Sequence, residues 1–453
     1  MTTALLWFRR DLRLSDNPAL VEAARSADDV VGAFCLDPAL LGPAGDARRS
    51  HLLGCLAALD ESMDGNLVVR TGDPAVVIPE LAVEVGAASV HLAEDFGPYG
   101  RRRDDAVAER AVDAGMELVR TGSPYAVPPG SIMNKAGSPY RVFTPFSRAW
   151  RDHGWPEPTR RPSKIAWRRA PGDPIPAPPD LAGVDLPPAG EAAARTRLDR
   201  FLRTGVRDYD EARDAPGADA TSRLSPDLRW GTLHPRQILA RLGRSGAEQT
   251  FATELCWREF YADVLFHRPE SARESMDEAV GSMPWDRGAD ADELFEAWAQ
   301  GRTGYPIVDA GMRQLLGEGW MHNRVRMITA SFLVKDLHLA WQRGARWFMQ
   351  HLVDGDLASN QHGWQWTAGT GTDAAPFFRI FNPTTQGERF DPDGTYVRRW
   401  VPELSDVPAK WVHRPAEGPD GLPAGYPAPI VDHAEERSES LRRYEATRSG
   451  MIS

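Results

Sequence analysis

Ala4-Leu5-Leu6-Trp7-Phe8-Arg9-Arg10-Asp11-Leu12-Arg13 is the stretch that decides the fold of the first part of this chain. Its first half is wholly apolar, and the second half is charged except for Leu12. A short apolar run predicts a β-strand, and the charged half predicts the loop at the carboxyl end of that strand. Open α/β sheets bind their ligands at these carboxyl ends, so we expect residues 9–13 to form a ligand loop.

The same alternation of strand-like and helix-like runs continues through residues 1–130. It is the βαβ pattern of an open parallel sheet, so we predict a Rossmann-like α/β domain over this range. A second charged loop, residues 94–101, follows the fourth predicted strand and is a second expected ligand loop. The predicted helix covers Asn17–Arg25, and the predicted strands after the first cover Val30–Leu36, Leu67–Arg70, Ser89–Leu92 and Glu117–Arg120.

A proline-rich segment separates this domain from a helical one. Proline crowds residues 155–188 and disfavours regular helix and sheet ladders there, so we predict an interdomain linker over residues 131–195. From residue 196 to 453 apolar residues recur at the helical period, which predicts a mostly α-helical domain. The clearest predicted helices are Glu248–Phe266, Ile307–Gly317, Met321–Ala340, Ala345–Leu352 and the charged terminal Ala434–Thr447.

The composition favours a cytoplasmic protein without metal. A chain of 453 residues is long enough for two or more domains. It has no run of the ~18–20 apolar residues that a membrane helix needs, and Met1–Phe8 shows no export signal. Cys35, Cys55 and Cys256 form no CxxC pair, which disfavours a zinc or iron–sulfur site and fits a reducing compartment. The net charge of −11 is a global sum and does not exclude a local surface that binds nucleic acid.

One predicted helix carries an unusual polar face. Glu254, Trp257 and Arg258 stand at i, i+3 and i+4, so they share one side of the helix. An acid, an indole and a guanidinium together are an odd core surface and could bind a planar polar ligand. The alternative is an acid–arginine pair covered by the tryptophan.

A second helix repeats this spacing with Asn323, Arg326 and Met327, while Arg324 points elsewhere. Taken alone, it is an ordinary charged helix. Asp354-Gly355-Asp356 could accept a hydrogen bond from a ring N–H with one carboxylate and pair with Arg326 through the other. The alternatives are a solvated turn or a cation site, and two carboxylates are few for a metal.

Two further segments are candidates for a nucleotide site. Thr221–Pro226 places three hydroxyls before a helical run, where free backbone N–H groups suit a pyrophosphate; plain capping is the alternative. Asn360–Trp366 holds an amide and two indoles. Trp364 and Trp366 lie about 200° apart around a helix, so they cannot both face one core. One can point inward while the other lines a cavity.

The order of these motifs resembles the DNA photolyase–cryptochrome family, and within it the class I cyclobutane pyrimidine dimer photolyases. The likeness runs nearly end to end. The motifs that carry it are Trp7–Arg13 with Asp16-Asn17, Val142–Phe146, Thr221–Pro226, Glu254–Tyr261, Gly304–Asp309, Trp320–Met327, Asp354–Asp356 and Trp364–Pro383.

The resemblance implies an N-terminal antenna domain and a helical domain that holds FAD in a folded form. It implies a light-driven carbon–carbon lyase, in which reduced FAD gives an electron to a flipped-out cyclobutane dimer, the ring opens and the electron returns. The implied partner is UV-damaged DNA, and we expect a monomer. The implied FAD contacts are Tyr209, Thr221, Ser222, Leu224, Ser225, Arg326, Asp354, Asp356 and Asn360, the last opposite flavin N5.

The resemblance also implies catalytic and substrate residues. Glu254 would hydrogen-bond the dimer, in a protonated form that a dry pocket would favour. Trp364 and Trp341 would be the inner members of a tryptophan chain that reduces FAD under light, with Trp285 as the outer member. The remaining implied contacts to dimer and DNA are the stacking walls Trp257 and Trp366, the further contacts Arg258, Asn323 and Met327, and the phosphate contacts Arg324 and Arg379.

The chain departs from the family pattern in two places. Between Trp285 and Trp298 it is about three residues longer than related sequences, which bears on the outer tryptophan. Gln361-His362 stands where many relatives have asparagine-glycine. His362 could tune the flavin, but a packing role is favoured.

Residues 95–101 with Arg103-Asp104 resemble the deazaflavin-binding branch of the family. We therefore expect 8-hydroxy-5-deazaflavin as the antenna rather than methenyltetrahydrofolate, with Asp95 as its contact; FMN or no antenna are the alternatives. Two other functions within the family are alternatives. A cryptochrome-type photoreceptor should differ at position 360 or carry a long C-terminal extension, and a (6-4) photolyase should carry histidine where Met327 stands. A nucleotide-binding protein outside the family would leave Glu254, Trp257 and Trp366 unexplained.

Overall fold

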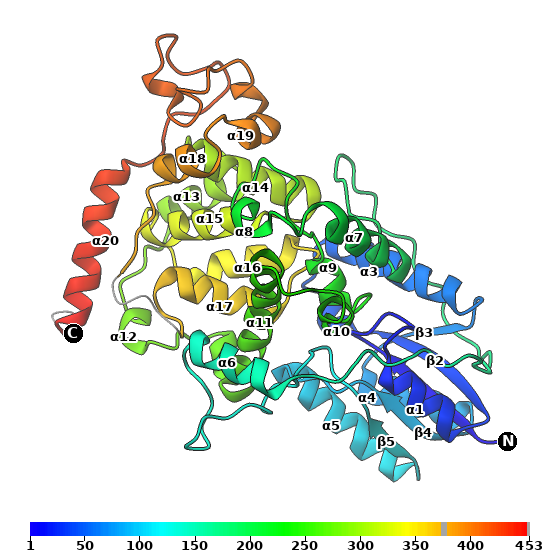
Figure 1. Ribbon diagram of the computed structural model, residues 1–453. Coiled ribbons are helices and arrows are strands. Elements are labelled where there is room, and N and C mark those ends of the chain that lie inside the picture. The colour runs from blue at the N-terminus through cyan, green and yellow to red at the C-terminus, as the bar shows by residue number, and fades with distance from the viewer. Residues whose placement is uncertain (373–377, 451–453) are drawn as a thin grey trace. The chain divides into compact units, whose positions relative to one another are not determined.

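The computed structural model describes residues 1–372 and 378–450 (Figure 1). Residues 373–377, within the Trp364–Pro383 motif, and residues 451–453, at the end of the predicted helical domain, lie outside the described residues. The chain forms two compact units. The first comprises Met1–Ala182, Leu186–Arg207 and Ser222–Pro269, and the second comprises Gly183–Asp185, Asp208–Thr221 and Glu270–Ser453.

The first unit is built on a five-stranded parallel sheet of order β3-β2-β1-β4-β5. The elements of the unit are β1 (Thr3–Phe8), α1 (Pro18–Ser26), β2 (Asp29–Leu36), α2 (Pro38–Leu41), α3 (Asp46–Ser62), β3 (Leu67–Thr71), α4 (Pro74–Glu84), β4 (Ala87–Leu92), α5 (Pro98–Asp113), β5 (Glu117–Arg120), α6 (Phe143–His153), α7 (Glu191–Thr204), α9 (Ser225–Trp230), α10 (Pro235–Leu239) and α11 (Gly246–His267).

Alternate side chains of β1 enter two different cores. Leu6 and Phe8 pack with residues of α1 and α3 on one face of the sheet, and Leu5 and Trp7 pack with residues of α4 and α5 on the other. Every residue of β1 is buried, as expected for a central parallel strand covered on both faces. The apolar run that opens the chain therefore becomes the middle of the sheet.

The second unit is helical. Its elements are α8 (Tyr209–Ala212), α12 (Glu278–Gly281), α13 (Ala289–Ala299), α14 (Pro306–Glu318), α15 (Asn323–Lys335), α16 (Trp341–His351), α17 (Leu357–Ala368), α18 (Pro383–Phe390), α19 (Thr395–Trp400), the 3-10 helices η2 (Pro402–Leu404) and η3 (Pro415–Glu417), and α20 (His433–Arg448). A further 3-10 helix, η1 (Pro269–Ala272), crosses the boundary between the units. The core of the second unit lies among α13 to α17 and includes Trp298, Phe332, Trp341 and Trp364.

The predicted strands and the α/β class are confirmed, and so is the helical second half. One predicted helix, Met321–Ala340, is too long. His322 caps it by accepting from the backbone N–H of Arg324 at 3.2 Å, and the helix ends at Lys335. His338 has a φ of 51°, which no continuing α-helix allows. The chain therefore turns before α16 begins at Trp341, four residues ahead of the predicted start at Ala345.

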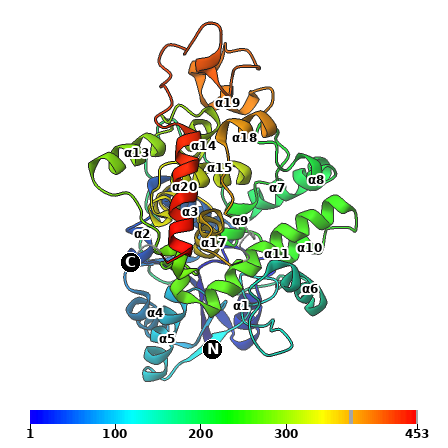
Figure 2. The same cartoon turned by 90° about the vertical axis from the view of Figure 1, so that its left-hand side faces the viewer.

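Helix α6 lies inside the segment predicted to be a linker. Phe143, Phe146 and Trp150 stand at helical spacing, and all three are buried. This stripe packs α6 against α11 (Figure 2). The prolines after residue 154 masked a helical signal that stands just before them. The functional division into residues 1–130, 131–195 and 196–453 remains a prediction.

Cys35, Cys55 and Cys256 are buried free thiols, and burial raises the pKa of Cys35 and of Cys55 to about 12. Across the described residues, no helix combines the length and the apolar character that crossing a membrane requires. Over the same residues, no three His, Cys, Asp or Glu side chains are grouped as a metal ion would need.

Candidate functional site

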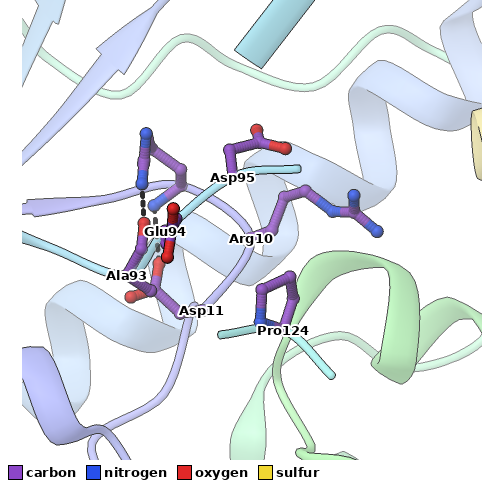
Figure 3. A pocket seen from close by; sticks show the side chains of 7 residues that line it. Arg10, Asp11, Ala93, Glu94, Asp95 and Pro124 are labelled. Atoms are coloured by element: carbon purple, nitrogen blue, oxygen red, sulfur yellow. Dashed lines mark hydrogen bonds between the residues drawn. The ribbon is translucent and has the colours of Figure 1, made fainter. Parts of the chain in front are cut away.

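A pocket opens in the first unit at the carboxyl ends of β1 and β4 (Figure 3). The chain leaves β1 toward β2 and β3 on one side of it and returns to β4 and β5 on the other. This is the topological switch point, where open α/β sheets bind ligands. The pocket encloses at most about 220 Å³, and its lining comes from both predicted ligand loops together with Pro124: Arg9, Arg10, Asp11, Ala93, Glu94 and Asp95.

Asp95, one of three acidic residues that line this pocket, stays ionised. Burial alone would raise the pKa of Asp95, but the positive charges of Arg103, Arg10 and Arg9 outweigh burial and lower it. Its carboxylate accepts from the backbone N–H of Gly97 at 3.1 Å and from Arg103 at 3.3 Å. A Cβ on Gly100 would lie 2.2 Å from Cγ of Asp95, so a glycine is needed there for the acid to fit.

Helix α11 carries Glu254, Trp257 and Arg258, and all three are half-buried. The indole of Trp257 stacks on the ring of Phe143, with centroids 3.5 Å apart and an interplanar angle of 6°. The predicted stripe therefore forms a surface of the first unit that is backed by α6.

The guanidinium of Arg258 is engaged inside the first unit. It donates to the carbonyl oxygens of Pro124 at 3.1 Å and of Leu228 at 3.0 Å, and it lies 4.6 Å from the ring centroid of Tyr125. These contacts anchor α11 to the loop at Pro124 and to helix α9. They engage both terminal nitrogens of the guanidinium with backbone carbonyls, and the predicted role of Arg258 as a substrate contact stays a prediction.

The predicted phosphate segment begins a helix as expected, with α9 starting at Ser225. The Ser222 hydroxyl accepts from the backbone N–H of Leu224 at 3.3 Å, and Arg223 adopts a φ of 50°. The boundary between the units falls between Thr221 and Ser222. Tyr209, in the second unit, is buried at the start of α8.

In the second unit Arg326 and Asp354 form the predicted ion pair. Nη2 of Arg326 lies 2.7 Å from Oδ2 of Asp354, whose side chain is 2% exposed. Nε of Arg326 donates to the Met321 carbonyl at 2.8 Å, which fixes the plane of the guanidinium. Asp356 caps α17 by accepting from the backbone N–H of Ser359 at 3.1 Å. A carboxylate pair thus stands directly before the helix that carries Asn360 and Trp364.

Asn360 and His362 are tied into α17 and its neighbours. Nδ2 of Asn360 donates to the Ala345 carbonyl of α16 at 3.0 Å. Nδ1 of His362 donates to the Ala358 carbonyl at 2.8 Å, so its Nε2 accepts from the Ser271 hydroxyl at 3.0 Å. Burial lowers the pKa of His362 to about 4. A neutral histidine with both nitrogens bonded supports the packing role expected for this residue.

The tryptophans of α16 and α17 are buried together. Trp364 is 2% exposed and Trp341 is 1% exposed, and Nε1 of Trp341 donates to the Ser275 hydroxyl at 3.1 Å. A Cβ on Gly344 would lie 2.1 Å from Cη2 of Trp364, so this glycine makes room for the indole. Of Trp364 and Trp366, Trp364 is therefore the one that points inward. Trp366 is half-buried, as is Trp285, whose Nε1 donates to the Gly281 carbonyl at 3.3 Å.

Three of the predicted DNA contacts lie on the first turns of α15. Asn323 is exposed, and Met327 is half-buried. Arg324 forms a two-point contact with Asp214, at 3.3 Å from Nε to Oδ1 and 2.8 Å from Nη2 to Oδ2. Arg379 is exposed.

Sequence reasoning missed four residues that contact the predicted site residues. They are Asp214 beside Arg324, Phe143 beside Trp257, Gly344 beside Trp364 and Ser275 beside Trp341. None of the four stands near its contact residue in the sequence.

The comparisons decide the family. Residues 4–163 match the model described as DNA photolyase, and residues 251–446 match the model described as the FAD binding domain of DNA photolyase. The chain belongs to the DNA photolyase family. The photolyase-type FAD domain covers most of the second unit, including every predicted cofactor residue from Arg326 to Asn360.

The chain is similar over nearly its whole length to curated proteins that share one name. The deoxyribodipyrimidine photo-lyase of Agrobacterium fabrum is 40% identical, over 98% of this chain and 98% of that protein. Those of Streptomyces griseus and Escherichia coli are 41% identical, over 98% and 99% of this chain and 99% and 100% of theirs. The expectation of a light-dependent DNA-repair lyase is therefore confirmed for this photolyase family member.

Solved structures agree with the fold. A bacterial class III photolyase from Agrobacterium tumefaciens superposes with a TM-score of 0.92 at 38% identity, covering 99% of this chain and 98% of its own. The cryptochrome of Synechocystis superposes with a TM-score of 0.90 at 29% identity, covering 98% of this chain and 99% of its own. An archaeal photolyase from Sulfolobus tokodaii, solved with two FAD molecules, superposes with a TM-score of 0.83 at 29% identity, covering 98% of this chain and 100% of its own.

Proposed function

We propose that this protein splits cyclobutane pyrimidine dimers in UV-damaged DNA under blue light. The observation that carries the proposal is the identity of about 40% to enzymes named deoxyribodipyrimidine photo-lyase over nearly their whole lengths. Bound FAD, in its reduced form, supplies the electron that opens the cyclobutane ring. The protein binds, orients and shields the two reactants.

The residues of the second unit fit a flavin. Oδ1 of Asp354 is buried, and among the described residues it has no hydrogen-bond partner. A buried acceptor left unpaired is costly, and a flavin ring N–H at this place would remove that cost. We assign Asp354 and Asp356 as acceptors beside the ring, with Arg326 balancing their charge and Asn360 near N5. The proposed contacts to the rest of FAD are Tyr209, Thr221, Ser222, Leu224 and Ser225.

The substrate residues are proposed in two groups. Glu254 hydrogen-bonds the dimer and Trp257 and Trp366 stack on it. Turning a dimer out of the duplex costs a few kcal/mol, and stacking at about 1–3 kcal/mol per base can offset it. Asn323 and Met327 add contacts to the dimer. Arg324 and Arg379 hold phosphates without reading the base sequence.

Arg258 is reassigned. Its bonds to two carbonyl oxygens make it an anchor of α11, so we propose that it supports Glu254 and Trp257 rather than contacting DNA.

We propose that Trp285, Trp341 and Trp364, in this order, carry an electron from the surface to oxidised FAD under light. The half-buried position of Trp285 and the burial of Trp341 and Trp364 support this order. Because Trp364 is buried in the core, water is kept away from the proposed electron transfer between Trp364 and FAD.

The strand-end pocket of the first unit is the proposed antenna site. An ionised Asp95 can accept a ring N–H, which suits 8-hydroxy-5-deazaflavin; methenyltetrahydrofolate remains the less favoured alternative. At about 220 Å³ the pocket is smaller than the ~300–1,000 Å³ usual for organic ligands, so side chains at its rim must move for a tricyclic ring to enter. Mass spectrometry of chromophores released from the purified protein tests this assignment, and a folate or a second flavin would overturn it.

Dimer reversal in UV-irradiated oligothymidine tests the proposed function. We expect repair by the reduced protein under blue light and none in darkness. Glu254→Ala should lower the repair yield, and Glu254→Gln, which keeps a hydrogen-bond donor, should lower it less if the protonated acid is the working form. The likeness to the Synechocystis cryptochrome supports one second candidate, a light receptor without repair. A protein that binds FAD but reverses no dimer would favour that candidate.

A further inference from the structure

Phe143 covers one face of Trp257 in the first unit. Their ring centroids are 3.5 Å apart and the planes differ by 6°. The centroids are much closer than those of two other nearly parallel pairs, Trp298–Phe348, at 6.1 Å, and Phe378–Tyr444, at 4.5 Å. Aromatic pairs usually prefer offset or edge-to-face geometries with centroids about 4.5–7 Å apart. Surrounding packing therefore has to hold this face-to-face pair in place.

The surroundings of Phe143 supply that packing. Its ring meets Phe260 of α11 edge to face, with centroids 5.8 Å apart, and Phe260 is fully buried. Phe146, one turn further along α6, also contacts Phe260, at 5.1 Å. Phe143 is the first residue of α6, and the residue at the N-cap, Val142, makes no capping hydrogen bond with its side chain. The first turn of α6 is thus held by its aromatic contacts.

Polar contacts fix the rest of α6 to α11. Nε1 of Trp150 donates to the buried carboxylate of Glu259 at 2.6 Å. Nη2 of Arg151 donates to the Thr253 hydroxyl at 2.7 Å. These bonds hold α6, which carries Phe143, in place against α11, while Trp257 itself is only half-buried.

We infer that Phe143 is a positioning residue for substrate binding, which holds the Trp257 indole in the plane that a flipped pyrimidine stacks on. The inference rests on the proposed function, in which Trp257 is a wall of the dimer site. A side chain that is already ordered loses less freedom when a ligand binds. Without Phe143 the indole can tilt, and each binding event has to order it again.

Phe146 provides a matched control, since it lies on the same helix and contacts Phe260, whereas Phe143 is the residue of the described part of α6 whose ring stacks on Trp257. The affinity for UV-irradiated oligothymidine is measured in the dark, and the repair yield per absorbed photon is measured at saturating substrate. We expect Phe143→Leu to raise the Kd about three- to tenfold and to leave the yield unchanged. Phe143→Tyr, which keeps the ring, should bind as the native protein does.

Phe146→Leu should lower the Tm at least as much as Phe143→Leu while leaving the Kd unchanged. Native affinity in Phe143→Leu, or an equal loss of affinity in both leucine variants, would overturn the inference. If Phe143→Leu does not fold, Phe143→Met replaces it with the same expected results. A native protein that binds no irradiated DNA would overturn the proposed function itself, which separates the two failures.

Discussion

Nη2 of Arg326 lies 2.7 Å from Oδ2 of Asp354, while Oδ1 of the same carboxylate is buried and has no hydrogen-bond partner among the described residues. One oxygen thus serves the ion pair and the other is available for a ligand. Removing one partner of a buried charge pair is costly because the other charge remains.

Asp354→Asn should therefore release FAD. The amide keeps the shape of the carboxylate but loses the charge that balances Arg326, and we expect FAD affinity to fall about tenfold or more, or ~1.4 kcal/mol. Flavin absorbance after dilution and filtration measures the loss. Asp214→Asn is the matched control, because it breaks an Asp–Arg pair of similar length, 2.8 Å, at a more exposed place. Equal flavin loss in both variants would contradict the assignment.

Trp364→Phe should abolish the photoreduction of oxidised FAD and spare repair by pre-reduced protein. The indole is proposed to pass an electron to the flavin, whereas dimer splitting starts from flavin that is already reduced. Absorbance under blue light follows the first activity, and dimer reversal follows the second. Trp230→Phe, at a buried tryptophan of the first unit without an assigned role, controls for general damage. Loss of both activities would show that Trp364 is needed for the fold or for FAD binding.

Gly344→Ala should destabilise the second unit. The added methyl group would meet Cη2 of Trp364 at 2.1 Å and Cδ2 of Leu333 at 2.6 Å, and overpacking of this kind costs about 1–3 kcal/mol. Gly363→Ala on α17 meets nothing within 4 Å and should be neutral or stabilising by up to ~1 kcal/mol, since alanine favours helix. Unfolding by denaturant compares the stabilities of Gly344→Ala and Gly363→Ala with that of the native protein. An unchanged midpoint in Gly344→Ala would refute the tight contact.

His362 should make stability depend on pH between about 6.5 and 4. Its pKa falls from 6.5 in the unfolded chain to about 4 in the fold because of burial. The unfolded chain therefore binds the proton first, so the contribution is complete above pH 6.5 and is lost as the pH falls toward 4. The shift corresponds to about 3 kcal/mol. Relative to His362→Gln, the native protein should lose about this much free energy of unfolding over the range. If the free energy of unfolding of the two proteins changed equally with pH, protonation of His362 would not be the cause of the pH dependence.

The sequence predicted the elements whose signals are local. The apolar run Ala4–Phe8 and the Glu254–Trp257 spacing each depend on neighbours in the chain, and both appear in the structure as expected. An ion pair of Arg326 with one carboxylate of Asp354-Gly355-Asp356 was also expected from the residues, and the family resemblance pointed to Asp354.

What the sequence could not predict are contacts between distant segments. Arg258 stands at the right spacing to face a ligand, yet the carbonyls that hold it belong to the loop at Pro124 and to Leu228 of α9, 134 and 30 residues away in the chain. Met321–Ala340 has a continuous apolar pattern, and only the backbone at His338 shows that the helix stops. The three buried residues of α6 did carry a helical signal, which the neighbouring prolines obscured.

The sealed thiols of Cys35, Cys55 and Cys256 have a practical consequence for spectroscopy. Maleimide reagents attack the thiolate, and burial both hides these sulfurs and keeps them protonated. A cysteine introduced on the surface of either unit would then be the labelled one in an otherwise native background. Spin or fluorescent probes could be attached in pairs without first removing the natural residues, and the separation of the two units could be measured in solution with and without damaged DNA.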